Sequence, residues 1–278
     1  MNRILIALAV FIASAAGAAE YSDLYIIPGA GHSHGAFGTL WRSDVVLHNI
    51  QTVPITVEIA MVESGRSPAA APIAITVGGE TALHLNPGET RTLSDVAGQL
   101  GRDIAGALIV GADLPFAVTS RTYAELPTGR TLGQTVTPVA ISGSADAVND
   151  VAVLPSLTSG EGQRSNVGVF VAASHAPLVV EIALLSPSGS ALGSQLVVVD
   201  EPGFVHQQLS LAQIGAAAAN STAVVRILEG DGIIVPYASI IDNVSAEAVF
   251  VSGGPISSRG AASRSMLASV VAGGEAAW

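Results

Sequence analysis

The sequence predicts an all-β protein made of two tandem immunoglobulin-like antiparallel β-sandwiches, each with one short helical segment. Runs rich in valine, isoleucine and threonine alternate apolar and polar residues, which is the period of a half-buried strand. Turn signals such as Pro87-Gly88 separate these runs at short spacing, as in antiparallel sandwiches. The same order of segments also occurs twice, which indicates two modules of one fold.

The two copies begin with residues 41–67 and 163–190. Each stretch contains Arg-Ser-Asp or Arg-Ser-Asn, an alternating strand, a short polar turn, a second alternating strand with Val-Glu-Ile-Ala, and a Ser/Gly turn. Ile55, Val57 and Ile59 are expected to face the core of the first module, because alternate side chains of a strand share a face.

The later part of each copy also follows one order. A Pro-Gly turn precedes a segment with helical spacing, at residues 93–100 in the first copy and 209–214 in the second. Two further strands are then predicted within residues 105–123, and two within residues 222–242.

These patterns divide the chain into a signal peptide, two modules, a linker and a tail. The linker has the Gly/Ser/Ala/Asp composition of a domain boundary. The tail is rich in Gly, Ser and Ala, and is expected to be mobile or to form one weak helix. The predicted segments are the signal peptide 1–19, the first β-sandwich module 20–142, the linker 143–149, the second β-sandwich module 150–252 and the tail 253–278.

The N-terminal segment has the pattern of a secretory signal peptide. Arg3 supplies the basic region, an apolar run follows, and small residues fit cleavage after Ala18 or Ala19. A membrane anchor is the alternative, but the apolar run is shorter than the roughly 20 residues that cross a bilayer. We therefore expect a secreted protein, periplasmic or extracellular, with no transmembrane segment after cleavage.

Composition excludes several kinds of chemistry. Hydrophobic residues make up 49% of the 278 residues, so the chain can bury a sizeable core. Lysine and cysteine are both absent, which excludes a Schiff base, a P-loop lysine, a disulfide and a thiolate nucleophile. The net charge of −11 and the scattered arginines argue against a nucleic-acid partner. We expect no cofactor.

A Gly-rich segment holds the candidate metal ligands. His32 and His34 lie two positions apart, so on a strand their side chains point the same way. Together with Asp44 they could hold a divalent metal ion. The alternative is a loop whose histidines are solvated or bonded to the backbone, and the second copy has no histidine at the equivalent place. No metal site is predicted on these residues alone.

A Ser/His/Asp hydrolase could be assembled from Ser33 or Ser43 with His48 and Asp44. The sequence lacks the Gly-x-Ser-x-Gly elbow of α/β hydrolases. Asp44 and His48 are four positions apart on one extended strand, which is too far for a hydrogen bond. The sequence therefore predicts no catalytic residues.

Three arginines are candidate binding residues. Arg42 and Arg164 occupy the same place in the two copies, each at the start of a strand, and Arg121 lies near the end of another strand. We favour a structural role, in which Arg42 and Arg164 fix equivalent corners through carbonyl or carboxylate partners. The alternative is ligand binding by these arginines together with Asp44.

These motifs are similar to a known group. The stretches Ile27-Pro28, Trp41-Arg-Ser-Asp44, Ser120-Arg-Thr-Tyr123 and Tyr237-Ala-Ser239 resemble those of a group of uncharacterised secreted bacterial proteins with paired β-sandwich modules. The resemblance covers nearly all of the mature chain. It implies the fold and export, and because the group has no assigned activity it implies no site residue.

The sequence therefore favours an exported, non-enzymatic binding, adhesive or envelope-structural protein, whose partner is a protein or another component of the cell envelope. One alternative is a metal-dependent or serine hydrolase that uses the His32/His34 loop. Another is a periplasmic chaperone-like protein, since such chaperones also pair two sandwiches. The resemblance to such chaperones would imply an arginine and a lysine that hold the C-terminus of a subunit. This chain has no lysine, which argues against this alternative.

Overall fold

The computed structural model describes residues 21–35, 38–141, 151–216 and 219–257. The predicted signal peptide and linker, and the tail beyond residue 257, lie outside the described residues. Within the described ranges, no helix is both long and apolar enough to cross a membrane.

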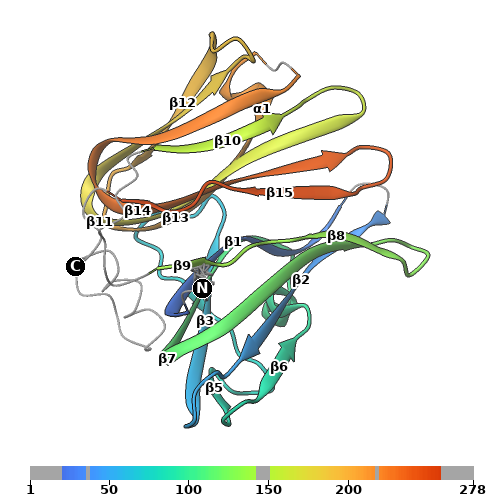
Figure 1. The fold of residues 1–278 in the computed structure, drawn as a ribbon, viewed down its shortest axis with the longest axis vertical. Helices are drawn as coiled ribbons and strands as arrows, with labels where there is room; N and C mark the ends of the chain where they lie inside the picture. Colours follow the sequence, from blue (N-terminus) through green and yellow to red (C-terminus); the bar gives the residue numbers. More distant parts are fainter. Residues whose placement is uncertain (1–20, 36–37, 142–150, 217–218, 258–278) are drawn as a thin grey trace, which may run out of the picture.

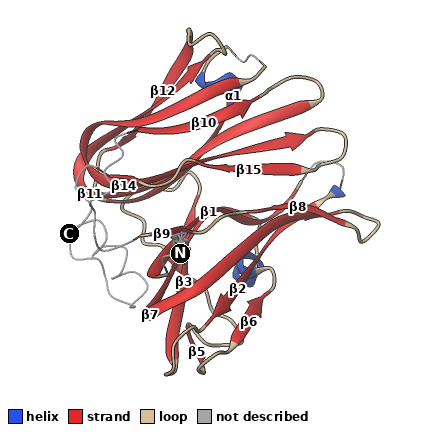
Figure 2. Cartoon of the chain, in the orientation of Figure 1, coloured by secondary structure: helices blue, strands red, loops and turns tan. Residues whose placement is uncertain are grey.

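The prediction of an all-β fold is confirmed, because strands form nearly all of the structure (Figure 2). The first half, residues 21–141, forms an antiparallel 9-stranded sheet. Its strands are β1 (Ser22–His34), β2 (Leu40–His48), β3 (Ile55–Glu63), β4 (Ile73–Ala74), β5 (Ala82–Leu85), β6 (Thr90–Leu93), β7 (Ile104–Glu125), β8 (Thr131–Thr135) and β9 (Val139–Ala140).

The second half, residues 151–257, forms an antiparallel 7-stranded sheet above the first in Figure 1. Its strands are β10 (Val151–Leu157), β11 (Gln163–Leu185), β12 (Ala191–Val199), β13 (Gly203–Ser210), β14 (Ser221–Asp242), β15 (Ala248–Ser252) and β16 (Ile256–Ser257). β16 pairs with β14, so the first residues of the predicted tail belong to the sheet.

Both predicted helical segments are present and short. A 3₁₀ helix spans Val96–Leu100, and α1 spans Leu211–Ile214. At the start of α1 the backbone N–H of Ser210 donates to the side-chain oxygen of Gln213 (2.8 Å), as in a capping box. Each helical segment buries two apolar side chains, which fix it to the core of its half.

The prediction of two separate strands within 105–123 and within 222–242 is wrong. β7 and β14 are continuous strands that change partners midway. β7 pairs with β3 as far as Ala112 and with β2 from Ala117 onward, so it passes from one layer of the sandwich to the other. Asp113-Leu114-Pro115 lies between these pairings, where the register of β7 against β1 also shifts. Such corners, made by strands that switch sheets, are typical of tightly packed sandwiches.

The second half repeats the pairings of the first. β2 pairs with β6 and β7, and the start of β11 pairs with β13 and β14 in the same way. The polar turn predicted between the two alternating strands of the second copy is part of β11, where the register shifts between Ala173 and Val180. These register shifts let the single strand β11 change direction. In the first half, the same change of direction is made by the loop between the separate strands β2 and β3.

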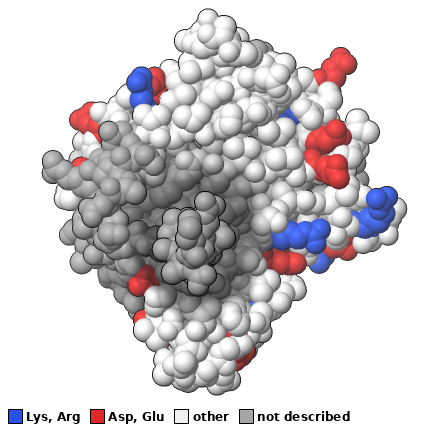
Figure 3. Space-filling model, viewed as in Figure 1, with Lys and Arg blue, Asp and Glu red and all other residues white. Residues whose placement is uncertain are grey.

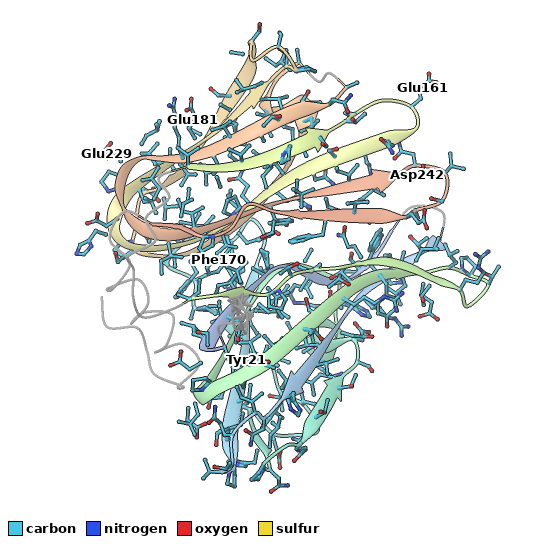
Figure 4. The ribbon with its side chains drawn as sticks, in the orientation of Figure 1. Tyr21, Glu161, Phe170, Glu181, Glu229 and Asp242 are labelled. Carbon is cyan, nitrogen blue, oxygen red and sulfur yellow. The ribbon has the colours of Figure 1, made fainter. Side chains whose placement is uncertain are left out.

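Three hydrophobic cores are formed by the described residues. Each half has a core of its own, and a third core lies between the halves. In β1, Tyr25 and Ile27 face the core of the first half, whereas Leu24 and Ile26 face the second half. Figure 4 shows Phe170 of β11 at this boundary. We call this third cluster the shared core; it comprises Leu24, Ile26, Val62, Ala107, Ile109, Val139, Ile141, Phe170, Ala172, Phe204, Ile233 and Val235.

Candidate functional site

A cavity of about 210 Å³ continues the boundary between the halves next to the shared core. Strands β1, β2, β7 and β8 line it from the first half, and β11, β13, β14 and β15 line it from the second. We call this cavity the inter-half cleft. Arg164 and Gln208 in its lining are exposed, so the cleft reaches the surface on that side. Because both halves supply its walls, neither half forms the site alone.

Aromatic side chains form one part of the lining. The rings of His206, Tyr237 and Phe250 stack in a row, with centroid distances of 5.9 Å and 5.6 Å and interplanar angles of 22° and 19°. Trp41 of β2 adds a half-buried indole from the first half. The cleft therefore offers apolar ring faces to a ligand.

A buried histidine ties this aromatic row to the first half. The Nε2 atom of His206 lies 3.1 Å from the carbonyl oxygen of Pro28 and 3.0 Å from the hydroxyl of Tyr237. Its Nδ1 atom lies 2.5 Å from the hydroxyl of Ser64. Burial lowers the pKa of His206 to about 4, and its hydrogen bond to the Pro28 carbonyl raises the pKa by a smaller amount. The ring is therefore neutral near pH 7.

The contacts of His206 assign its tautomer and the role of Tyr237. The Pro28 carbonyl can only accept, so Nε2 carries the proton and Nδ1 accepts from the Ser64 hydroxyl. Burial also raises the pKa of Tyr237 well above its ordinary value, so its phenol keeps its proton. The single hydrogen on Nε2 is shared between the Pro28 carbonyl and the Tyr237 oxygen, so Tyr237 does not donate to His206.

Glycines make room for the Tyr237 ring. A Cβ on Gly168 would lie 2.2 Å from Tyr237 ring carbons, and one on Gly29 would lie 3.4 Å from the ring. Contacts of 2.2 Å cannot be accommodated without moving the tyrosine. Gly168 in β11 therefore sets the position of the aromatic row.

Amide and hydroxyl groups form the polar part of the lining. Gln134 of β8 donates to the Ser239 hydroxyl of β14 (3.1 Å), which bridges the halves. The side-chain amides of Asn166 and Gln208 make no hydrogen bond to another residue in the described part of the chain. Arg164 donates to the Asn243 amide oxygen (2.6 Å). The described lining contains no Asp or Glu.

The candidate metal ligands contact different carboxylates. The Nδ1 atom of His32 lies 2.8 Å from Asp95, and that of His34 lies 3.0 Å from Asp103. Asp44 accepts instead from the backbone N–H of Asp95 (2.8 Å). Among the residues that the structure describes, no three His, Cys, Asp or Glu side chains are grouped to hold a metal ion.

The residues of the hypothetical Ser/His/Asp set are dispersed. His48 contacts the Thr90 hydroxyl through Nδ1 (2.8 Å), whereas Asp44 also accepts from the Tyr123 hydroxyl (3.3 Å). Ser43 is buried and accepts from the backbone N–H of Gly31 (2.8 Å). Ser33 lines the inter-half cleft. The structure does not place these side chains in a nucleophile–base arrangement.

The two equivalent arginines have different surroundings. Arg42 forms ion pairs with Glu125 (3.1 Å) and Asp95 (3.7 Å), and its Nε is buried without a hydrogen-bond partner among the described residues. Arg164 is exposed and lines the cleft. Arg121 lies over the Tyr123 ring, 4.7 Å from its centroid. Only Arg164 of these candidates belongs to the cleft.

Sequence reasoning missed most of the cleft residues. Trp41, His206, Tyr237 and Phe250 are widely separated along the chain, and no local motif joins them. The rarity of Trp, Tyr and Phe could have singled out these residues as candidates, because the three types make up only 4% of the sequence.

Comparisons with known proteins add little to this description. No family model matches the chain, and no curated protein matches it. One similar solved structure is an FMN-binding beta-glucuronidase from Facaelibacterium prausnitzii L2-6, with 11% identity over 80% of this chain and a TM-score of 0.14. The chain spans 33% of that enzyme. Another is the BSP domain of a biofilm associated protein, with 8% identity over 87% of this chain and 68% of that one, and a TM-score of 0.16. TM-scores this low carry no argument about function.

Proposed function

We propose that the protein is an exported, non-catalytic binding protein of the cell envelope or the exterior, and that it holds its ligand in the inter-half cleft. One observation carries the proposal: the two halves together form a cleft whose lining combines aromatic rings with amide and hydroxyl groups. Apolar surface with a few placed polar groups is the usual composition of a small-molecule site. Export rests on the signal-peptide pattern of residues 1–19.

The chemistry of the lining favours binding over catalysis. The described lining offers no carboxylate as a general acid or base. Both ring nitrogens of His206 are engaged, by Ser64 and by Pro28, and its low pKa leaves it a weak base. In the described lining the one charged side chain is Arg164, which is bonded to Asn243. The charged groups on the face seen in Figure 3 are few and scattered. The cleft is therefore suited to an uncharged or weakly charged ligand.

The proposal is tested by capture from an extract of the native envelope. The immobilised protein should retain a component that Asn166→Ala loses, because this amide has no partner of its own in the described structure. Gln195→Ala is the matched control, since Gln195 lies on β12 outside the cleft and donates to the adjacent Leu196 carbonyl. Equal retention by both variants would show that the cleft is not the binding site.

The non-enzymatic part of the proposal needs its own test. Purified protein is assayed for bound metal and screened with esterase, peptidase and glycosidase substrates. We expect no turnover. Hydrolysis that His32→Ala abolishes, or a tightly held stoichiometric metal ion, would favour the hydrolase alternative over this proposal.

A further inference from the structure

We infer that the ligand of the inter-half cleft is a single uncharged sugar ring, either free or at the end of a glycan. This inference rests on the proposed function, because it names the ligand of the same site. Three features of the cleft carry it: its size, its aromatic rings and its polar groups.

The size limits the ligand to about one ring. The cleft volume of about 210 Å³ is below the roughly 300 to 1,000 Å³ of sites that enclose drug-sized molecules. A single pyranose can enter such a space. A longer chain would have to continue past exposed Arg164 and Gln208 at the surface.

The aromatic rings match the apolar face of a sugar. The C–H bonds on one side of a pyranose carry small positive charges, which are attracted to the negative face of an aromatic ring. Trp41 and Phe250 are half-buried and line the cleft from opposite halves, so each can offer such a face.

The polar groups match sugar hydroxyls, which both donate and accept. The amides of Asn166 and Gln208 supply both donors and acceptors. No Asp or Glu in the described lining could pair with a cationic ligand. The single guanidinium, Arg164, is already bonded to Asn243, and the chain carries a net charge of −11 that repels anions. An uncharged polyhydroxyl ring satisfies these conditions.

Tryptophan fluorescence provides the test. The sequence has two tryptophans, Trp41 and Trp278, so Trp278→Phe leaves Trp41 as a single reporter in the cleft. This variant is titrated with methyl glycosides of glucose, galactose and mannose, with N-acetylglucosamine, and with an uncharged capped dipeptide. At least one sugar should give a saturable change. Gln208→Ala should weaken binding of that sugar about five- to tenfold, as expected for one lost hydrogen bond, and Gln195→Ala should not.

The outcomes separate the two proposals. If no sugar changes the fluorescence while capture from the envelope extract still depends on Asn166, the sugar assignment is wrong and the proposed function stands. Binding of the dipeptide alone would also overturn the sugar assignment. If neither sugar binding nor Asn166-dependent capture occurs, both proposals are wrong. Thermal unfolding of each variant shows that it is folded, so that a loss of binding is not a loss of structure.

Discussion

Ser64 and His206 are 142 positions apart in the sequence, and the hydroxyl of one lies 2.5 Å from the ring nitrogen of the other. The backbone reinforces this contact, since the N–H of Gly65 donates to the carbonyl of His206 (3.1 Å) and the N–H of Phe204 donates to that of Pro68 (3.3 Å). The loop after β3 therefore bonds to β13 of the other half. These bonds and the shared core hold the two walls of the cleft at a fixed distance.

His206 should make the protein less stable in acid. The pKa of His206 is about 4 in the folded protein, below the ordinary histidine value of 6.5 that applies to the unfolded chain. As the pH falls below 6.5 the unfolded chain takes up the proton first, so stability is lost down to about pH 4 and no further below it. At about 1.4 kcal/mol per pH unit this amounts to roughly 3 kcal/mol.

The variant His206→Gln removes this titration and keeps a side chain that can hydrogen-bond. Urea unfolding at pH 7 and pH 4.5 should show a smaller loss in the variant, by about 2 to 3 kcal/mol. His84→Gln, at an exposed position, is the control and should lose as much as the unmodified protein. An unchanged pH dependence in His206→Gln would show that another group controls acid stability.

Removal of the Phe170 ring should weaken the shared core. Phe170 is fully buried and packs against Phe204 with a centroid distance of 6.4 Å. Phe170→Ala should cost about 3 to 5 kcal/mol, the usual range for a buried aromatic ring. Val249→Ala, at a side chain that is 59% exposed, should change stability by less than about 0.5 kcal/mol. Equal unfolding free energies for the two variants in urea would contradict a core between the halves.

Addition of one methyl group at Gly168 should displace Tyr237. The new Cβ would lie 2.2 Å from ring carbons, so Gly168→Ala should lower the unfolding free energy by about 1 to 3 kcal/mol. Gly162→Ala is the control, because nothing lies within 4 Å of a Cβ there. Near-ultraviolet circular dichroism should report the change in the tyrosine environment for Gly168→Ala only. A normal spectrum and normal stability would mean that Gly168 does not position the ring.

The two equivalent arginines should differ in their effect on stability. Arg42→Ala leaves Asp95 and Glu125 without their cation, at a site where the arginine side chain is only 33% exposed, and should cost about 1 to 3 kcal/mol. Arg164→Ala removes an exposed hydrogen bond and should cost less than about 1 kcal/mol. Arg42→Lys should restore part of the loss, because an ammonium cannot reproduce the planar fork. Thermal unfolding compares the variants; equal losses at both positions would support the equivalent roles that the sequence suggests.

Local patterns were enough to predict the fold class. The alternation in Ile55, Val57 and Ile59 specified a strand with one buried face, and β3 has that face buried. The helical spacing of both copies predicted the two short helices, because capping and spacing act over a few residues. The first residues of each predicted segment belong instead to the preceding strands, β6 and β13. The turn signals were misleading at β7 and β14, where they predicted two strands in place of one. A bend within a continuous strand and a break between two strands carry the same Gly, Pro and Asp signals.

The sequence by itself determined which residues share a face of a strand, since side-chain period depends only on local backbone geometry. In β1, the run Leu24-Tyr25-Ile26-Ile27 is buried on both faces. The sequence did not determine what covers the second face. Only the tertiary structure decided that this face of β1 packs against Phe170, and that Trp41, His206 and Tyr237 meet in one cleft. The reason is physical: hydrophobic attraction is non-directional, so the partner of an apolar face is chosen by the shape of the whole chain.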